Sequence, residues 1–406
     1  MKKNLFILLF FTSLIAFSQK VVNYKGKVQL DSKKNITATF IVSMEANNSM
    51  EDLEFLINKN ADVSKILCDN KHVDFEEEKV VDEFLSDVKK IRIKNVFSEK
   101  FSISISYKYP LTKIEDPNFI YNENWIELNF YTGFFPFRNS DRSYSYHIDI
   151  QVPKNYQVIS SGTISKKRNI YSISSLGNTF DIPLTISDKF EIFNSSNGKI
   201  RFYTVGLNEK TKDELKKDAE DIFNLYEEKF GKTVSNELIV CVNPYNHQMS
   251  FARKGLVSLA LGKDYTSRNR QTLAHEIGHL WWSNAQFDTW EEWLNESFAE
   301  YSSLLWCERN FDKKEFEEIL KSYTEELKNS VKISQLKGSM DNNWYSIIYI
   351  KGSYLLFDMY KTIGEEKFFA MLQEVNIKKI NNTKDLKEIF SKYLSKEQME
   401  HFFKNI

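Results

Sequence analysis

The stretch HEIGHLWWSNAQFDTWEEWLNESFAEY, residues 275–301, constrains the fold of this chain more than any other segment. His275 and His279 are four residues apart, so on an α-helix their imidazoles share one face, with Cβ atoms about 6 Å apart. Glu276 lies roughly 100° further round the helix, where it suits a water on a bound ion better than the ion itself. Two nitrogens, one carboxylate and an open position suit zinc. The pattern therefore predicts a zinc site on a helix.

The third ligand must come from another segment. Glu296 is the best candidate, because the sixteen residues between His279 and Glu296 are enough for a turn and an antiparallel helix. Glu291 and Glu292 are weaker candidates, since carboxylates at a helix start favour the helix dipole whatever else they do. Glu300, one turn after Glu296, is either a partner that holds a ligand imidazole by its other nitrogen or an ordinary solvated or ion-paired carboxylate.

Three motifs, HEIGHLWWSN, WLNESFAEY and YIKGSYLLFDM, resemble those of the gluzincin zinc metallopeptidases that include aminopeptidase N and leukotriene A4 hydrolase. The resemblance is strong at 272–301 and 344–359 and loose over the rest of the mature chain. It implies that His275, His279 and Glu296 bind one zinc ion. It also implies that Glu276 acts as general base and acid in the hydrolysis of peptide bonds.

Tyr349 stands at the first position of the family's Y-x-K-G motif, so the resemblance implies that its phenol steadies an oxyanion. A fixed O–H donor in a dry site lowers such a barrier by roughly 3 kcal/mol. Without the resemblance, Tyr345, Tyr349 and Tyr354 would be interpreted as aromatic residues of a hydrophobic core.

A length of 406 residues favours two domains over one. From 19 to 195 the chain reads as strands, such as FSISISYKY at 101–109 with its strict alternation. From 196 to 406 it reads as an α/β region that is mostly helical toward its end. We expect a multidomain protein of α and β structure. The resemblance implies an N-terminal β-rich saddle or sandwich, then a thermolysin-like α/β zincin catalytic domain.

After Ser267 helical spacing predominates. The sequence predicts helices at about 268–284, 291–308, 313–328, 344–362, 365–375, 384–394 and 396–404. Ser395 with Gln398 three residues later predicts a capping box at the start of the last of these helices.

Residues 1–18, MKKNLFILLFFTSLIAFS, have the pattern of a signal peptide: two lysines, a short apolar run and a small-x-small cleavage site. We expect an exported protein, whether periplasmic, on the cell surface or secreted, with no membrane span. Near-balanced charge, with Lys+Arg 55 against Asp+Glu 56, disfavours nucleic acid as a partner. The three cysteines, Cys68, Cys241 and Cys307, suggest no disulfide framework and are interpreted as buried thiols.

Three features depart from the family pattern. The spacing between the second histidine and the ligand glutamate is sixteen rather than eighteen residues. The strand expected to carry a G-x-M-E-N glutamate, which grips a substrate's α-amine, is taken as GLVSLAL at 255–261 and has no acid. The chain ends before the family's large helical C-terminal domain, so we expect a more open cleft. Strict aminopeptidase specificity is therefore in doubt, and a zinc-stabilised peptide- or protein-binding module without activity remains the alternative.

Overall fold

The computed structural model describes residues 20–45, 52–80, 88–94, 99–111, 122, 124–138, 141, 143–177, 179–233, 237–245, 249–262, 264–327, 331–338 and 341–406. The predicted signal peptide at 1–18 lies outside the described residues. None of the helices in these ranges is long and apolar enough to cross a bilayer.

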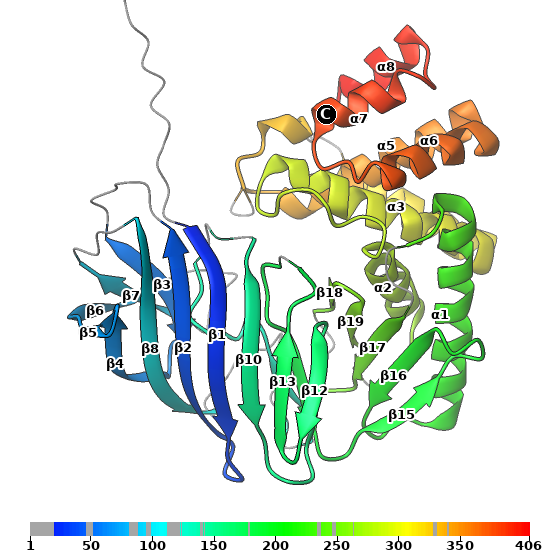
Figure 1. Cartoon of the computed structure of the whole chain (residues 1–406). Helices are drawn as coiled ribbons and strands as arrows, with labels where there is room; N and C mark the ends of the chain where they lie inside the picture. The colour runs from blue at the N-terminus through cyan, green and yellow to red at the C-terminus, as the bar shows by residue number, and fades with distance from the viewer. Residues whose placement is uncertain are drawn as a thin grey trace, which may run out of the picture.

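The first part of the chain is built from β-strands, which lie on the left and centre of Figure 1. These strands are β1 (Lys20–Leu30), β2 (Asn35–Glu45), β3 (Leu53–Asn58), β4 (Asp62–Cys68), β5 (Lys71–His72), β6 (Phe75–Lys79), β7 (Val88–Ile93), β8 (Lys100–Pro110), β9 (Ile126–Leu128), β10 (Ser145–Gln151), β11 (Gln157–Ile159), β12 (Thr163–Lys167), β13 (Ile170–Ser174) and β14 (Leu184–Ser187).

These strands form one large sheet and two small ones within the described ranges. The large sheet has the order β12-β13-β10-β1-β2-β8-β4-β5, and the small sheets are β11-β14-β9 and β3-β7-β6. Alternation sets their faces: β8 buries every second side chain, from Phe101 to Tyr109, as its sequence predicts.

The second part combines a mixed sheet with helices. Its strands are β15 (Glu191–Asn194), β16 (Ile200–Thr204), β17 (Leu238–Asn243), β18 (Phe251–Arg253) and β19 (Leu256–Ala260), in the order β15-β16-β17-β19-β18. Its helices are α1 (Glu209–Phe230), α2 (Ser267–Gly278), α3 (Trp293–Asn310), α4 (Lys313–Glu326), α5 (Gly352–Ile363), α6 (Glu365–Ile377), α7 (Thr383–Phe390) and α8 (Lys396–Phe403). The 3₁₀ turn η2 (Trp290–Glu292) leads directly into α3, and the π-helical segment η4 (Ser346–Lys351) leads directly into α5.

An N-terminal β-sheet region followed by a helical region is the predicted fold class, which is therefore confirmed. The predicted boundary between residues 195 and 196 falls between β15 and β16 and stays a prediction. The capping box of Ser395 and Gln398 is present at the start of α8.

The seven predicted helices all occur, with three main differences. The sixth, predicted to reach residue 394, ends at Phe390. The prediction that the first extends to residue 284 is wrong, since α2 ends at Gly278. After it, the amides of Leu280 and Trp281 bond carbonyls three residues back, which tightens the last turn and bends the chain away. The segment before α5 is a π-helix, which apolar periodicity did not indicate.

Candidate metal centre

Helix α2 holds both histidines close to its C-terminal end. Thr266 caps its start by accepting from the amide of Asn269, and the Asn269 side-chain oxygen accepts from the amide of Thr266. Leu273 and Ile277 are fully buried, which fixes the helix against the core. His275 follows on the last turn, and His279 is the C-cap residue.

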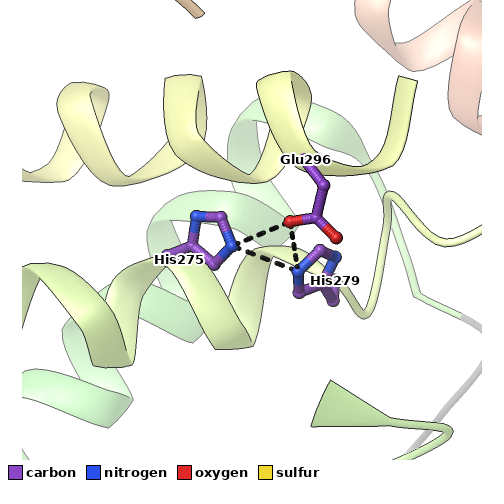
Figure 2. Close-up of side chains that lie close together, drawn as sticks. All are labelled: His275, His279 and Glu296. Atoms are coloured by element: carbon purple, nitrogen blue, oxygen red, sulfur yellow. Dashed lines mark hydrogen bonds and ion pairs between the residues drawn. The ribbon is translucent and has the colours of Figure 1, made fainter. Parts of the chain in front are cut away.

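The structure brings His275, His279 and Glu296 together, and Figure 2 shows the three side chains from α2 and α3 converging. The His275 Nε2 lies 3.2 Å from the His279 Nε2. The Glu296 Oε2 lies 3.2 Å from the His275 Nε2 and 3.4 Å from the His279 Nε2. A tetrahedral zinc with bonds of about 2.0–2.1 Å separates its ligand atoms by about 3.3–3.4 Å. The three atoms therefore form a triangle of the size of one tetrahedral face.

Each imidazole is held by its other nitrogen. The His275 Nδ1 donates to the Glu300 Oε2 at 2.6 Å, and the His279 Nδ1 donates to the carbonyl of Trp282 at 3.0 Å. These bonds leave the Nε2 lone pairs for an ion, as metal-binding histidines require. The structure thus places the Glu300 carboxylate against the imidazole of His275, and its role beside a metal ligand stays a prediction. The bend after α2 is what places the Trp282 carbonyl.

Burial and the neighbouring charges act in opposite directions on the pKa values of the candidate ligands. Burial disfavours the charged form of Glu296, but the neighbouring His279 and His275 outweigh it and hold the pKa of Glu296 below its usual range. Burial likewise works to lower the pKa of His275, and the contacts with Glu296 and Glu300 raise this pKa well above its usual range. Such a cluster is most stable when positive charge lies between its acceptor atoms.

Glycine sets the distance between the two ligand helices. A Cβ on Gly278 would lie 3.1 Å from the Cα and 3.3 Å from the carbonyl oxygen of Ala299, which is tighter than ordinary contact. A side chain at this position would push α3 away and move Glu296 from the histidines. A second glycine, Gly352, allows α5 to meet α3, because a Cβ there would lie 2.6 Å from the Ser297 Cβ.

Glu276 and Tyr349 lie beside the three candidate ligands. Glu276 lines a cleft that opens in front of these ligands. It is 7% exposed, and burial raises its pKa. The Tyr349 ring stacks on the His275 ring with 5.7 Å between centroids and an interplanar angle of 14°. Burial raises the pKa of Tyr349 well above its usual range, so its hydroxyl keeps its proton. A hydrogen bond also joins the segments that carry Glu296 and Tyr349. The hydroxyl of Ser297, next to Glu296, donates to the carbonyl of Ile348, next to Tyr349.

The weaker ligand candidates have other partners. A Glu291 carboxylate oxygen accepts from the amide and hydroxyl of Thr383, at 2.8 and 2.7 Å. Glu292 accepts from the amide of Asp288 at 2.7 Å. Neither belongs to the three-residue group whose ligand atoms converge.

The centre opens into a cleft of about 1990 Å³ between the β-rich region and the helices. The edge strand that lines it is β18, which pairs with β19 alone among the strands that the structure describes and contacts α2. Strand β19, which forms most of GLVSLAL, is not at the edge of the sheet, because it is hydrogen-bonded on both sides, to β17 and β18. A three-residue strand such as β18 leaves almost no periodic signal.

The residues of β18 are Phe251, Ala252 and Arg253, so this strand also has no acid. Arg253 donates from Nε to Asp181 at 2.8 Å and from Nη1 to the Ala252 carbonyl at 2.7 Å. Its guanidinium lies 4.4 Å from the centroid of the Phe180 ring. A buried ion pair thus ties the edge of the cleft to the β-rich region.

Comparison with known proteins identifies the family. Residues 246–405 match the model of the peptidase family M1 domain. This part of the chain belongs to peptidase family M1. No curated protein sequence matches the chain. The M1 domain contains a His-His-Glu group of the kind that holds one zinc ion, formed by His275, His279 and Glu296.

Solved structures share the fold. Native yeast leukotriene A4 hydrolase superimposes with a TM-score of 0.70 at 16% identity, over 95% of this chain and 66% of its own. An M1 zinc metallopeptidase from Deinococcus radiodurans, solved as a mutant with a Tyr-Ser-Ala substrate, gives a TM-score of 0.63 at 15% identity, over 95% of this chain and 93% of its own. The chain thus spans about 66% of the length of the yeast hydrolase.

Proposed function

We propose that the protein is a zinc metallopeptidase. One observation carries the proposal: three ligand atoms 3.2–3.4 Å apart, with a buried glutamate next to them and a cleft in front. His275, His279 and Glu296 would hold the ion. When bound, zinc lowers the pKa of a water molecule and polarises a carbonyl group.

The chain's own residues would handle the protons. Glu276 takes a proton from the attacking water as the water oxygen bonds to the peptide carbon, and it returns that proton to the nitrogen as the C–N bond breaks. The Tyr349 hydroxyl donates a hydrogen bond to the oxygen on which negative charge develops. Both side chains are held by packing, Glu276 on α2 and Tyr349 on the π-helical segment η4, so little reorganisation is needed.

The cleft favours peptides without a strict need for a free α-amine. A desolvated ammonium group requires a nearby anion, and β18 offers Arg253 instead of an acid. Residues of both regions line this cleft, from Lys20 and Ser160 in the β-rich region to Lys379 after α6. We therefore propose that internal segments of a polypeptide are accepted.

Pairs of peptides with a free or an acetylated N-terminus test both parts of the proposal. We expect both members of a pair to be cleaved, with cleavage lost on chelation and restored by added zinc. Product analysis by mass spectrometry provides the measurement. Cleavage of the free-amine member alone would overturn the specificity. Chelator-insensitive cleavage, or binding of peptides without cleavage, would overturn the metallopeptidase in favour of another hydrolase or the non-catalytic binding module.

We also propose that the protein is exported and that its two domains meet between residues 195 and 196. Export rests on the pattern of residues 1–18 alone, and the division at 195/196 rests on the change in the sequence from a strand pattern to a mixed α/β pattern.

A further inference from the structure

We propose that Tyr323 and Gln271 are positioning residues for the zinc ligand His275, and that they act through Glu300. The inference rests on the proposed zinc site and goes beyond it, because neither residue belongs to the motifs that define the site. Tyr323 comes from α4, which contributes no proposed ligand.

The Glu300 carboxylate accepts hydrogen bonds from three side chains. Its Oε2 accepts from the His275 Nδ1 at 2.6 Å. Its Oε1 accepts from the Gln271 Nε2 at 3.0 Å and from the Tyr323 hydroxyl. The Gln271 Nε2 also lies 3.0 Å from the Tyr323 oxygen, so the amide contacts the hydroxyl as well as Glu300. The result is a closed triangle of side chains behind one imidazole.

The three side chains of the triangle are buried. Gln271, Glu300 and Tyr323 are each 5% exposed. In such surroundings water does not replace a missing donor, and a carboxylate with an unsatisfied oxygen turns toward another donor. The orientation of Glu300, and with it the direction of the His275 ring, therefore depends on the Tyr323 hydroxyl and the Gln271 amide.

Helix α4 also reaches the segment that carries Tyr349. Glu326, near the end of α4, accepts from the hydroxyl of Ser346, at the start of η4. α4 contacts η4 directly. Helix α4 thus contacts both sides of the site. Its Tyr323 bonds Glu300, the partner of His275, and its Glu326 bonds the start of the segment that carries Tyr349. We infer that α4 acts as a brace for both sides of the site.

Replacing Tyr323 by phenylalanine removes one hydroxyl and keeps the ring. We expect zinc affinity to fall about 10- to 100-fold, the usual effect of losing such a support. Competition with a chromogenic chelator measures the affinity of zinc without any substrate. We also expect the d–d absorption spectrum of the cobalt-substituted protein to change, because the His275 ring is no longer held in one direction.

Tyr393→Phe is the matched control. It removes a tyrosine–glutamate bond of the same type, from the Tyr393 hydroxyl to Glu374 at 3.0 Å, which lies in the α6–α8 region away from the site. Gln271→Leu is a second test, with the same expected direction as Tyr323→Phe. Thermal unfolding of the metal-free proteins checks that each variant folds.

Zinc affinity and cobalt spectra equal to those of the wild type in both Tyr323→Phe and Gln271→Leu would overturn the inference, even if the variants unfold at lower temperature. A selective loss of zinc in these two variants, with Tyr393→Phe unchanged, would support it. If the wild type itself does not bind zinc, the proposed function fails, and that result is distinct from equal binding by all variants.

Discussion

Glu276→Gln should lower peptide hydrolysis by roughly 10²–10⁴-fold, the range that a general base contributes, while one zinc ion stays bound. The amide has nearly the shape of the carboxylate but cannot take a proton from water. Glu276 is not among the three residues whose ligand atoms converge, so the metal site keeps its donors. Turnover of a peptide with a fluorogenic group and metal content of the same sample are the measurements.

Glu214→Gln provides the control, since Glu214 is an exposed glutamate on α1 that lies outside the cleft lining. We expect its turnover to match that of the wild type. Undiminished turnover in Glu276→Gln would remove Glu276 from the proposed mechanism. Loss of zinc from that variant would instead assign it a role in metal binding.

His279→Ala should leave the protein without zinc at concentrations where the wild type holds one ion. The change removes one of three protein ligands, so its cost should exceed the roughly 10- to 100-fold that removal of an outer partner costs. Mass spectrometry under native conditions and elemental analysis after dialysis measure the loss. Hydrolysis should disappear with the metal and should not return when zinc is added at moderate concentration.

His401→Ala is the matched histidine control, because His401 lies on α8 with a side chain that is 74% exposed. It should retain one zinc ion. Full zinc occupancy in His279→Ala would contradict the assignment of His279 as a ligand.

Local periodicity accounts for the part of the site that the sequence predicts. Two histidines four apart share a helix face wherever that helix lies, and the spacing after His279, together with the resemblance, favours Glu296 on the next helix. The structure brings these three together. The partner of His275 stayed open, because Glu300 is on the same face as Glu296 in any helix, and only packing decides what it meets.

Long-range packing accounts for what was missed. Gln271 and Tyr323 are separated from Glu300 by 29 and 23 residues, and no motif connects them. The end of α2 at Gly278 depends on the turn that follows it, although apolar residues continue through Trp281 and Trp282. The edge strand β18 is three residues long, so alternation cannot distinguish it from a turn.

X-ray diffraction from crystals of the zinc-loaded protein, collected on both sides of the zinc absorption edge, tests the zinc centre most directly. We expect one anomalous peak bonded to the His275 Nε2, the His279 Nε2 and a Glu296 oxygen at about 2.0–2.2 Å, with a fourth position open to the cleft. A peak at other residues, or no peak between these three side chains in fully loaded crystals, would contradict this expectation.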